Sequence, residues 1–198
     1  DVMKFSRKEQ QSRRLYLFTD CLIITEESLL KAITRPYKLN KSYNAGDYTL
    51  TPINDYRTFI NSIQIRTIVK SATINMRTAK DKGEIMSMFE KVKTSNPREY
   101  SGSHAKVFAP VWIPDDFAPT CMHCGGKFTV INRKHHCRCC GKCICKTCSK
   151  FNDLIPFLNE REPQKVCNVC HTELTKLWAN PGAFDTEKER IVNQLQST

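Results

Sequence analysis

The sequence lacks the features that mark membrane-spanning and secreted proteins. No run of about 18 apolar residues occurs, so nothing in the chain is expected to span a bilayer. The opening residues, DVMKFSRKEQQSRR, contain no apolar core of a signal peptide, and secretion is therefore unsupported. Because the chain opens on a pattern typical of a strand, we expect it to be a piece of a longer protein.

Acidic residues are scarce. The 198-residue chain has 20 Asp and Glu against 31 Lys and Arg, which gives a formal net charge of +11. An anionic partner is therefore expected, whether a nucleic acid, a membrane surface or an acidic protein. The imbalance is greatest between Cys121 and Lys150, a stretch without any acidic residue. Its basic residues are Lys127, Arg133, Lys134, Arg138, Lys142, Lys146 and Lys150.

Cysteine, in contrast, is abundant, and its distribution indicates metal binding rather than disulfides. Cys21 stands alone, and the rest of the 11 cysteines fall between Cys121 and Cys170. Their total is odd, no secretion signal precedes them, and they come in C-x-x-C pairs, which in a reducing compartment are typical of zinc ligands. A module with so small an apolar core is expected to need the metal in order to fold.

Glycines decide which cysteines are ligands. Three C-x-x-C pairs are unambiguous, and the fourth starts at either Cys137 or Cys140. In CMHCG and CRCCG a glycine directly follows the second cysteine, where a knuckle tends to need a positive φ. Ile144 follows Cys143, and a β-branched residue is unfavourable there. The predicted ligands of two zinc ions are therefore Cys121, Cys124, Cys137, Cys140, Cys145, Cys148, Cys167 and Cys170. Cys139 and Cys143 are left over as thiols, and the spacing leaves open which pairs share an ion.

Residues 1–95 show the pattern of several short strands followed by one helix. The strands are expected in VMKFS, RRLYLF, CLIIT, YKL, YTLTPI, FINSIQI and SATINMRT. Apolar residues recur at helical spacing after Asp81, at Ile85, Met88, Phe89 and Val92. The pattern predicts a small β-barrel closed by a C-terminal helix, which makes the fold class α+β.

The opening segment VMKFSRKEQQSRRLYLFTDCLIITE resembles the first strands of a pleckstrin-homology (PH) domain. It is most similar to the PH domains that follow the Dbl-homology domain in Rho-family guanine nucleotide exchange factors. The expected closing helix differs from the family in one respect, since it has Met86, Met88 and Phe89 but no Trp. Basic residues surround the first loop, where they either meet phosphates or form a solvated face: Lys4, Arg7, Lys8, Arg13 and Arg14.

Residues 96–110 are rich in Pro, Gly and Ser and are expected to be a linker. Beyond it, Arg133 to Arg138 form the dense basic run RKHHCR. In a strand, Lys134, His136 and Arg138 would share one face, and Arg133 and His135 the other. Arg, Lys and His together suit a phosphate. The alternative is a solvated basic strand whose histidines bond backbone carbonyls.

Val130 and Ile131, in the stretch FTVIN, precede this run on a short loop between two knuckles. Apolar residues at the tip of a basic rim fit a loop that dips into a bilayer. The alternative is that both side chains pack on the module's own core.

Three signatures resemble those of the FYVE zinc-finger family, over residues 111–178: WIPD at Trp112 to Asp115, RKHHCR, and KVC at Lys165 to Cys167. The resemblance implies a cross-braced module with short strands, a C-terminal helix and two Zn²⁺ ions. It implies that one ion is held by Cys121, Cys124, Cys145 and Cys148, and the other by Cys137, Cys140, Cys167 and Cys170.

The resemblance also implies binding to phosphatidylinositol 3-phosphate on endosomal membranes, with Val130 and Ile131 inserted in the bilayer. In the family the basic cluster holds the 3-phosphate, and Asp115 and one histidine meet the sugar hydroxyls. The chain departs from the family in having Lys165 where the family has Arg, which keeps the charge but loses the bidentate fork. The headgroup residues implied are Asp115, Arg133, Lys134, His135, His136, Arg138 and Lys165.

Residues 179–198 are expected to be a helical tail. The segment before this tail, TELTKLW at residues 172–178, is helical in pattern, with Leu174, Leu177 and Trp178 on one side. NPG at residues 180–182 ends that helix. FDTEKERIVNQLQ then predicts a further helix, with Asp185 as a candidate N-cap.

Together these features favour a non-enzymatic adaptor, cytoplasmic and peripheral on endosomes, which forms the C-terminal part of a Rho-family exchange factor. A Rho GTPase would meet an upstream domain, and the PH half is a candidate for other phosphoinositides. His135 and His136 adjoin zinc-bound thiolates rather than a nucleophile with an orienting acid, so no catalytic site is expected. A zinc-finger adaptor that binds protein or nucleic acid is the main alternative, but the spacing of a C₂H₂ recognition helix for nucleic acid is missing. Two further alternatives are less favoured. A RING-type ubiquitin ligase would carry a His among its zinc ligands, and this module has cysteines alone. A FYVE-like finger that binds a Rab GTPase would not need the WIPD and RKHHCR signatures, which are intact here.

Overall fold

The computed structural model describes residues 1–5, 10–28, 36–100, 108–155, 158 and 162–179. The chain divides into two compact units, one of residues 1–67 and 72–106 and the other of residues 68–71 and 107–198. The tail predicted beyond Ala179 lies outside the described residues, as do Arg7 and Lys8 of the predicted basic cluster. Among the residues that the structure describes, no helix is both long and apolar enough to cross a membrane.

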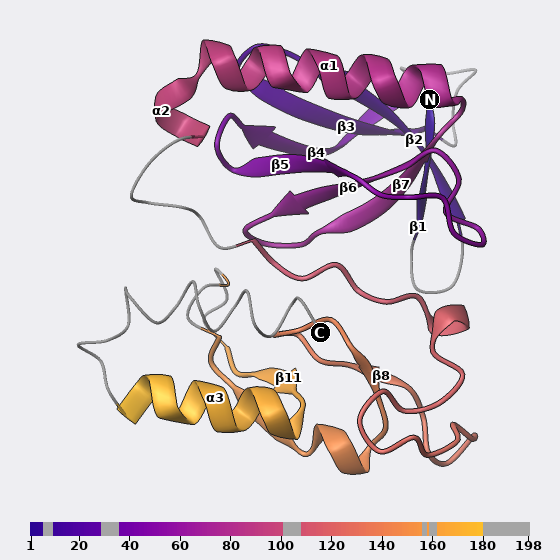
Figure 1. Cartoon of the computed structure of the whole chain (residues 1–198), viewed down its shortest axis with the longest axis vertical. Helices are drawn as coiled ribbons and strands as arrows, with labels where there is room; N and C mark the ends of the chain where they lie inside the picture. Colours follow the sequence, from indigo (N-terminus) through magenta and orange to yellow (C-terminus); the bar gives the residue numbers. More distant parts are fainter. Residues whose placement is uncertain (6–9, 29–35, 101–107, 156–157, 159–161, 180–198) are drawn as a thin grey trace. The chain divides into compact units, whose positions relative to one another are not determined.

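The first unit is built on a single antiparallel sheet, with strand order β4-β3-β2-β1-β7-β6-β5 (Figure 1). The strands are β1 (Val2–Phe5), β2 (Gln10–Leu17), β3 (Cys21–Glu27), β4 (Tyr37–Asn44), β5 (Tyr48–Pro52), β6 (Ser62–Thr67) and β7 (Ala72–Met76). Each corresponds to one of the short runs expected from the sequence. Alternate residues such as Leu22 and Ile24 in β3 are buried, as the two-residue period of a strand requires.

Helix α1 (Ala79–Ser95) lies along one end of the curved sheet (Figure 1). Thr78 and Asp81 start it with a capping box, in which Thr78 Oγ1 accepts from Asp81 N at 3.0 Å and Asp81 Oδ2 accepts from Thr78 N at 3.1 Å. Ile85, Phe89 and Val92 face the sheet and are buried, as their spacing predicts. Met88 was expected on that face but is 45% exposed.

The first five residues of the predicted linker continue the first unit. Asn96 caps α1, and α2 (Pro97–Tyr100) follows. The ring of Tyr100 packs edge-on against Phe89 and Tyr48, with centroid distances of 5.6 and 6.2 Å. The sequence does not predict α2, because Pro, Gly and Ser are common in this stretch and indicate a linker. The contacts of Tyr100 that stabilise α2 are with residues distant in sequence.

The second unit contains very little regular structure. It comprises the turns η1 (Asp115–Phe117) and η2 (Thr147–Ser149), the paired strands β8 (His135–His136) with β9 (Cys143–Ile144) and β10 (Phe151–Asp153) with β11 (Gln164–Val166), and helix α3 (Asn168–Ala179). Half of the buried residues in its core cluster are cysteines. This composition is that of a module organised around metal ions, with too few aliphatic side chains to hold it together otherwise.

Helix α3 packs on that core through Cys170, Leu174 and Leu177, all of which are buried. Trp178 was expected to share their side, but it is 49% exposed. Its indole Nε1 donates to the carbonyl of Leu154 at 3.4 Å. A ring that is large and carries a polar N–H is commonly placed this way, with one edge against the protein and one in water.

Candidate metal centres and anion site

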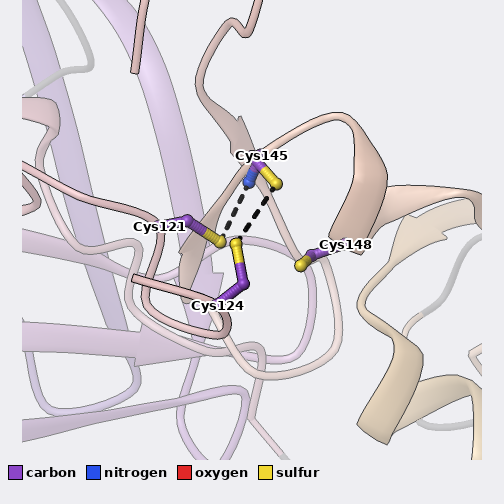
Figure 2. Close-up of side chains that lie close together, drawn as sticks. All are labelled: Cys121, Cys124, Cys145 and Cys148. Carbon is purple, nitrogen blue, oxygen red and sulfur yellow. Dashed lines mark hydrogen bonds between the residues drawn. The ribbon is translucent and has the colours of Figure 1, made fainter. Parts of the chain in front are cut away.

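Two groups of four cysteines converge in the second unit. The first is Cys121, Cys124, Cys145 and Cys148, whose side chains Figure 2 shows pointing toward a common centre. The second is Cys137, Cys140, Cys167 and Cys170. Within each group all sulfur atoms lie within 4.8 Å of one another. These are the two quartets that the sequence resemblance implied.

The spacing of the sulfurs suits zinc. A tetrahedral ion with Zn–S bonds of about 2.3 Å places its sulfurs about 3.8 Å apart. Cys124 and Cys145 Sγ are 3.8 Å apart in the first quartet (Figure 2), and Cys140 and Cys167 Sγ are 4.0 Å apart in the second. Four thiolates and no carboxylate are the ligand set of a structural, closed zinc site, so the chain holds two zinc ions in structural roles.

The two knuckles that begin the quartets have the same backbone. Gly125 N donates to Cys121 O at 2.8 Å, and Gly141 N donates to Cys137 O at 2.9 Å. Both glycines have positive φ, 70° and 80°, as the position after the second cysteine was predicted to need. At Gly141 a Cβ would also lie 2.5 Å from the carbonyl oxygen of Val111, so glycine is required there by space as well as by conformation.

Backbone amides point at the sulfurs and favour the thiolate form that a metal needs. Cys145 N donates to Cys121 Sγ at 3.3 Å, and Cys167 N donates to Cys137 Sγ at the same distance. Burial raises the pKa of Cys121, but hydrogen bonds from the backbone of Cys124, Cys145 and His123 outweigh it and lower the pKa to about 6. These amides therefore prepare the first quartet for the ion.

Strands β8 and β9 organise the basic run. His136 pairs with Cys143 across the two strands, and the His136 side chain is buried. Its ring stacks on Trp112, with centroids 4.9 Å apart and planes 5° apart. The guanidinium carbon of Arg138 lies 4.1 Å from the centroid of the same Trp112 ring. The shared face predicted for His136 and Arg138 is therefore present, with Trp112 as its platform.

Asp115 and Lys134 complete this face. His136 Nε2 donates to the carbonyl of Ile113 at 2.7 Å and lies 3.6 Å from Asp115 Oδ1. Lys134 Nζ donates to the backbone carbonyl of Asp115. Turn η1 thus holds a carboxylate next to an imidazole, a guanidinium and an ammonium group. A ligand with both hydroxyls and phosphate would find an acceptor and several donors here.

The other predicted headgroup residues, Arg133, His135 and Lys165, are each held by a different backbone partner. Arg133 Nε donates to the carbonyl of Val130 at 3.1 Å, which ties the run to the preceding loop. His135 is half-buried and pairs with Ile144. Lys165 Nζ donates to the carbonyl of Ser149 at 3.1 Å, and its backbone carbonyl accepts from Arg138 N at 2.9 Å. Lys165 is thus joined to Arg138 through the main chain.

The loop before the basic run presents two apolar side chains to solvent. Val130 is 86% exposed and Ile131 87%, so neither packs on the module's core. The loop is closed at its base because Thr129 N donates to Asn132 O at 3.1 Å and Asn132 N donates to Thr129 Oγ1 at 2.9 Å. Asn132 Nδ2 also donates to Lys127 O. The two exposed side chains therefore form the tip of an ordered turn.

Known proteins resemble both units. The model of the FYVE zinc finger family matches residues 111–176. Pleckstrin homology domain-containing family F member 2 of Danio rerio is 32% identical over 175 residues, which cover 88% of this chain and 69% of that protein. The chain belongs to the family of proteins that join a PH domain to a FYVE zinc finger.

Two further similar proteins match this chain to different extents. The human FYVE, RhoGEF and PH domain-containing protein 6 is 30% identical over 197 residues, which cover 89% of this chain but only 13% of that protein. The solution structure of the LM5-1 FYVE domain from Leishmania major is 42% identical, covering 33% of this chain and 77% of that one, with a TM-score of 0.31. The family assignment makes the second unit a membrane-targeting module.

Two of the basic residues predicted around the first loop of the PH unit, Arg13 and Arg14, are engaged within the fold. Arg13 forms an ion pair with Glu26 at 3.4 Å. Arg14 pairs with Asp1 at 2.7 Å and lies over the ring of Tyr37, 4.2 Å from its centroid. These contacts give Arg13 and Arg14 a structural role in the fold, and a phosphate site at this cluster stays a prediction.

Sequence reasoning left two contributors out of the site. The WIPD signature indicates Trp112 only as a family residue, whereas in the structure its ring supports both His136 and Arg138. The spacing predicts no role for the Cys143 thiol, yet Cys143 lies directly opposite His136 and is fully buried. A two-residue strand has no periodic pattern that could have identified Cys143, and its place opposite His136 follows from the pairing of β8 with β9.

Proposed function

We propose that this chain targets membranes by binding the headgroup of phosphatidylinositol 3-phosphate through its FYVE finger. The observation that carries the proposal is the turn at Val130 and Ile131, two apolar side chains almost fully exposed at the edge of the basic run. Exposed apolar pairs on an ordered turn are unfavourable in water and favourable in the interface of a bilayer. The same turn is tied to Arg133, so insertion brings the basic run to the headgroups.

The polar face supports a phosphorylated inositol in particular. In this proposal the cations of Arg133, Lys134, Arg138 and Lys165 hold the 3-phosphate, assisted by His135. The carboxylate of Asp115 and the ring of His136 bond the inositol hydroxyls. A carboxylate at the centre of a basic cluster is unfavourable for a site that binds phosphate alone. It is useful where hydroxyl groups must be recognised beside the phosphate.

The membrane turn can be tested separately from the headgroup site. Val130→Glu and Ile131→Glu each remove a side chain whose burial is worth about 1.5–3 kcal/mol and add repulsion by an anionic surface. We expect flotation with vesicles containing phosphatidylinositol 3-phosphate to be lost, while affinity for a soluble short-chain form stays unchanged. Val169→Glu, at an exposed apolar position on α3, is the matched control and should float like the wild type. Equal losses in both assays would show that the turn belongs to the fold rather than to the membrane contact.

We further propose that the chain acts at endosomes as the non-catalytic C-terminal part of a Rho-family exchange factor, whose catalytic domain would lie upstream. The supporting observation is the similarity to FYVE, RhoGEF and PH domain-containing protein 6. Expression of the full-length protein tests this, since it should accelerate nucleotide release from a Rho-family GTPase. The chain alone should not. Exchange activity of the chain alone, or none in the full-length protein, would contradict it.

A further inference from the structure

A third group of possible metal ligands lies inside the proposed headgroup site. A carboxylate oxygen of Asp115, a ring nitrogen of His136 and Sγ of Cys143 all lie within 4.8 Å of one another. None of these residues belongs to a quartet. We propose that they form a third cation site, for a thiophilic divalent ion such as Zn²⁺, and that this ion and the inositol headgroup exclude each other. The exclusion rests on the proposed function, whereas the cation site does not.

Local structure brings the three side chains together. His136 and Cys143 are directly opposite in the β8–β9 pair, and opposite residues in an antiparallel pair project from the same face. The chain before η1 is fixed against the knuckle that leads into β9, because Ile113 N donates to Gly141 O at 3.3 Å. Stacking on Trp112 sets the plane of the His136 ring. The grouping therefore follows from backbone pairing and packing, and it does not depend on the rotamer of one surface residue.

The donor set suits zinc. Carboxylate oxygen, imidazole nitrogen and thiolate are each common zinc ligands, and three protein ligands leave a fourth position for water or an exchangeable group. The bond lengths of about 2.0–2.3 Å imply ligand-to-ligand distances of about 3.3–3.8 Å. His136 Nε2 and Asp115 Oδ1 are already 3.6 Å apart. Since no pair exceeds 4.8 Å, closing the site requires side-chain shifts of about 1 Å.

This site should bind more weakly than either quartet. His136 Nε2 donates to Ile113 O at 2.7 Å, and binding a cation through that nitrogen breaks this bond. Arg138 and Lys134 are near the same face, and both repel a cation. The charges of the Asp115 carboxylate and of a Cys143 thiolate offset that repulsion. The quartets consequently fill first, and the third site responds to zinc in excess of what folding requires.

Exclusion follows from shared ligands. Asp115 and His136 are the residues proposed to bond the inositol hydroxyls, and a metal ion would occupy the same carboxylate and ring nitrogen. Excess zinc would therefore release the finger from the membrane without unfolding it. The reciprocal effect is required by linkage, so the headgroup must weaken the third ion by the same factor.

The stoichiometry of zinc tests the site itself. The protein is dialysed against buffered free Zn²⁺ over a range that begins where the quartets are full, and bound metal is measured by atomic emission. We expect a third equivalent in the wild type that is lost in Cys143→Ala and in Asp115→Asn. Cys139→Ala is the matched control, because Cys139 is equally buried and outside both quartets, and it should keep the third equivalent. No third equivalent in the wild type, or one that persists in both site variants, would overturn the site.

Binding of the soluble short-chain lipid tests the exclusion. At free Zn²⁺ ten times the dissociation constant of the third site, mutual exclusion weakens the apparent affinity about 11-fold in the wild type. Cys143→Ala should bind equally well at low and high zinc. If the third ion leaves the affinity for the short-chain lipid unchanged, the mutual exclusion is wrong, but the cation site itself is not contradicted. Absence of lipid binding at every zinc concentration would instead refute the proposed function, and the stoichiometry would still decide the cation site.

Discussion

At the scale of single residues, the two knuckle glycines differ in a way that can be measured. Both have positive φ, which costs a residue with a Cβ roughly 1–2 kcal/mol. Around Gly125 there is open space, whereas a Cβ at Gly141 would lie 2.5 Å from Val111 O. We expect Gly125→Ala to lower the stability of the zinc-loaded finger by the strain alone, and Gly141→Ala to lower it considerably more.

Chelator competition on the two variants measures this difference as a loss of zinc affinity. Gly83→Ala is the control, because Gly83 lies in α1 with nothing near its missing Cβ, and alanine is the better helix former by about 1 kcal/mol. Equal zinc affinities for Gly125→Ala and Gly141→Ala would contradict the close approach of Val111 to the second knuckle.

Three pairs of zinc ligands could be predicted from their C-x-x-C spacing, and the fourth could be predicted because Gly141 indicates a backbone conformation that few other residues adopt. Which pairs share an ion could not be derived from spacing and came from the family resemblance alone. The role of Trp112 was equally hidden, since a stacking contact depends on where two separate segments meet. Cys143 is excluded as a knuckle ligand by Ile144 after it, and its place opposite His136 depends on strand pairing, which the spacing does not predict.

At the scale of elements, the contribution of the α1 capping box to stability can be tested with a single substitution. Thr78→Ala removes the bond to Asp81 N and should lower the stability of the first unit by about 1 kcal/mol. Thr94→Ala is the control, since Thr94 is exposed on the same helix and its hydroxyl donates to Glu90 O within the helix. Thermal unfolding of both variants measures the effect. An unchanged melting temperature for Thr78→Ala would show that the cap contributes nothing to this unit.

The elements of the first unit followed closely from the sequence, because alternation and helical spacing record which side chains face a core. The strands and α1 appear where predicted, whereas α2 does not follow from any local pattern. Its order comes from Tyr100 packing on Tyr48 and Phe89. The second unit is different, because its strands of two or three residues are too short to show a periodic pattern. The cysteine ligands of the two zinc ions determine its structure instead.

At the scale of the whole molecule, the two units depend on different forces. The first has an aliphatic and aromatic core, and the core of the second is built largely of cysteines. Structural zinc is worth on the order of 10 kcal/mol per site, more than a small apolar core supplies. We therefore expect chelation to unfold the second unit while the first survives. Circular dichroism with limited proteolysis checks this, and protease resistance of metal-free residues 111–176 would contradict it.

The most direct test combines metal and lipid in one flotation experiment. Vesicles contain phosphatidylinositol 3-phosphate or the same fraction of phosphatidylinositol 4-phosphate, so that charge is matched, and the protein is zinc-loaded or chelated. We predict that the zinc-loaded chain floats with the 3-phosphate vesicles and much less with the 4-phosphate vesicles. Chelation should abolish flotation although the first unit stays folded. Equal flotation with both lipids, or flotation that survives chelation, would contradict recognition of the 3-phosphate by the zinc-folded finger.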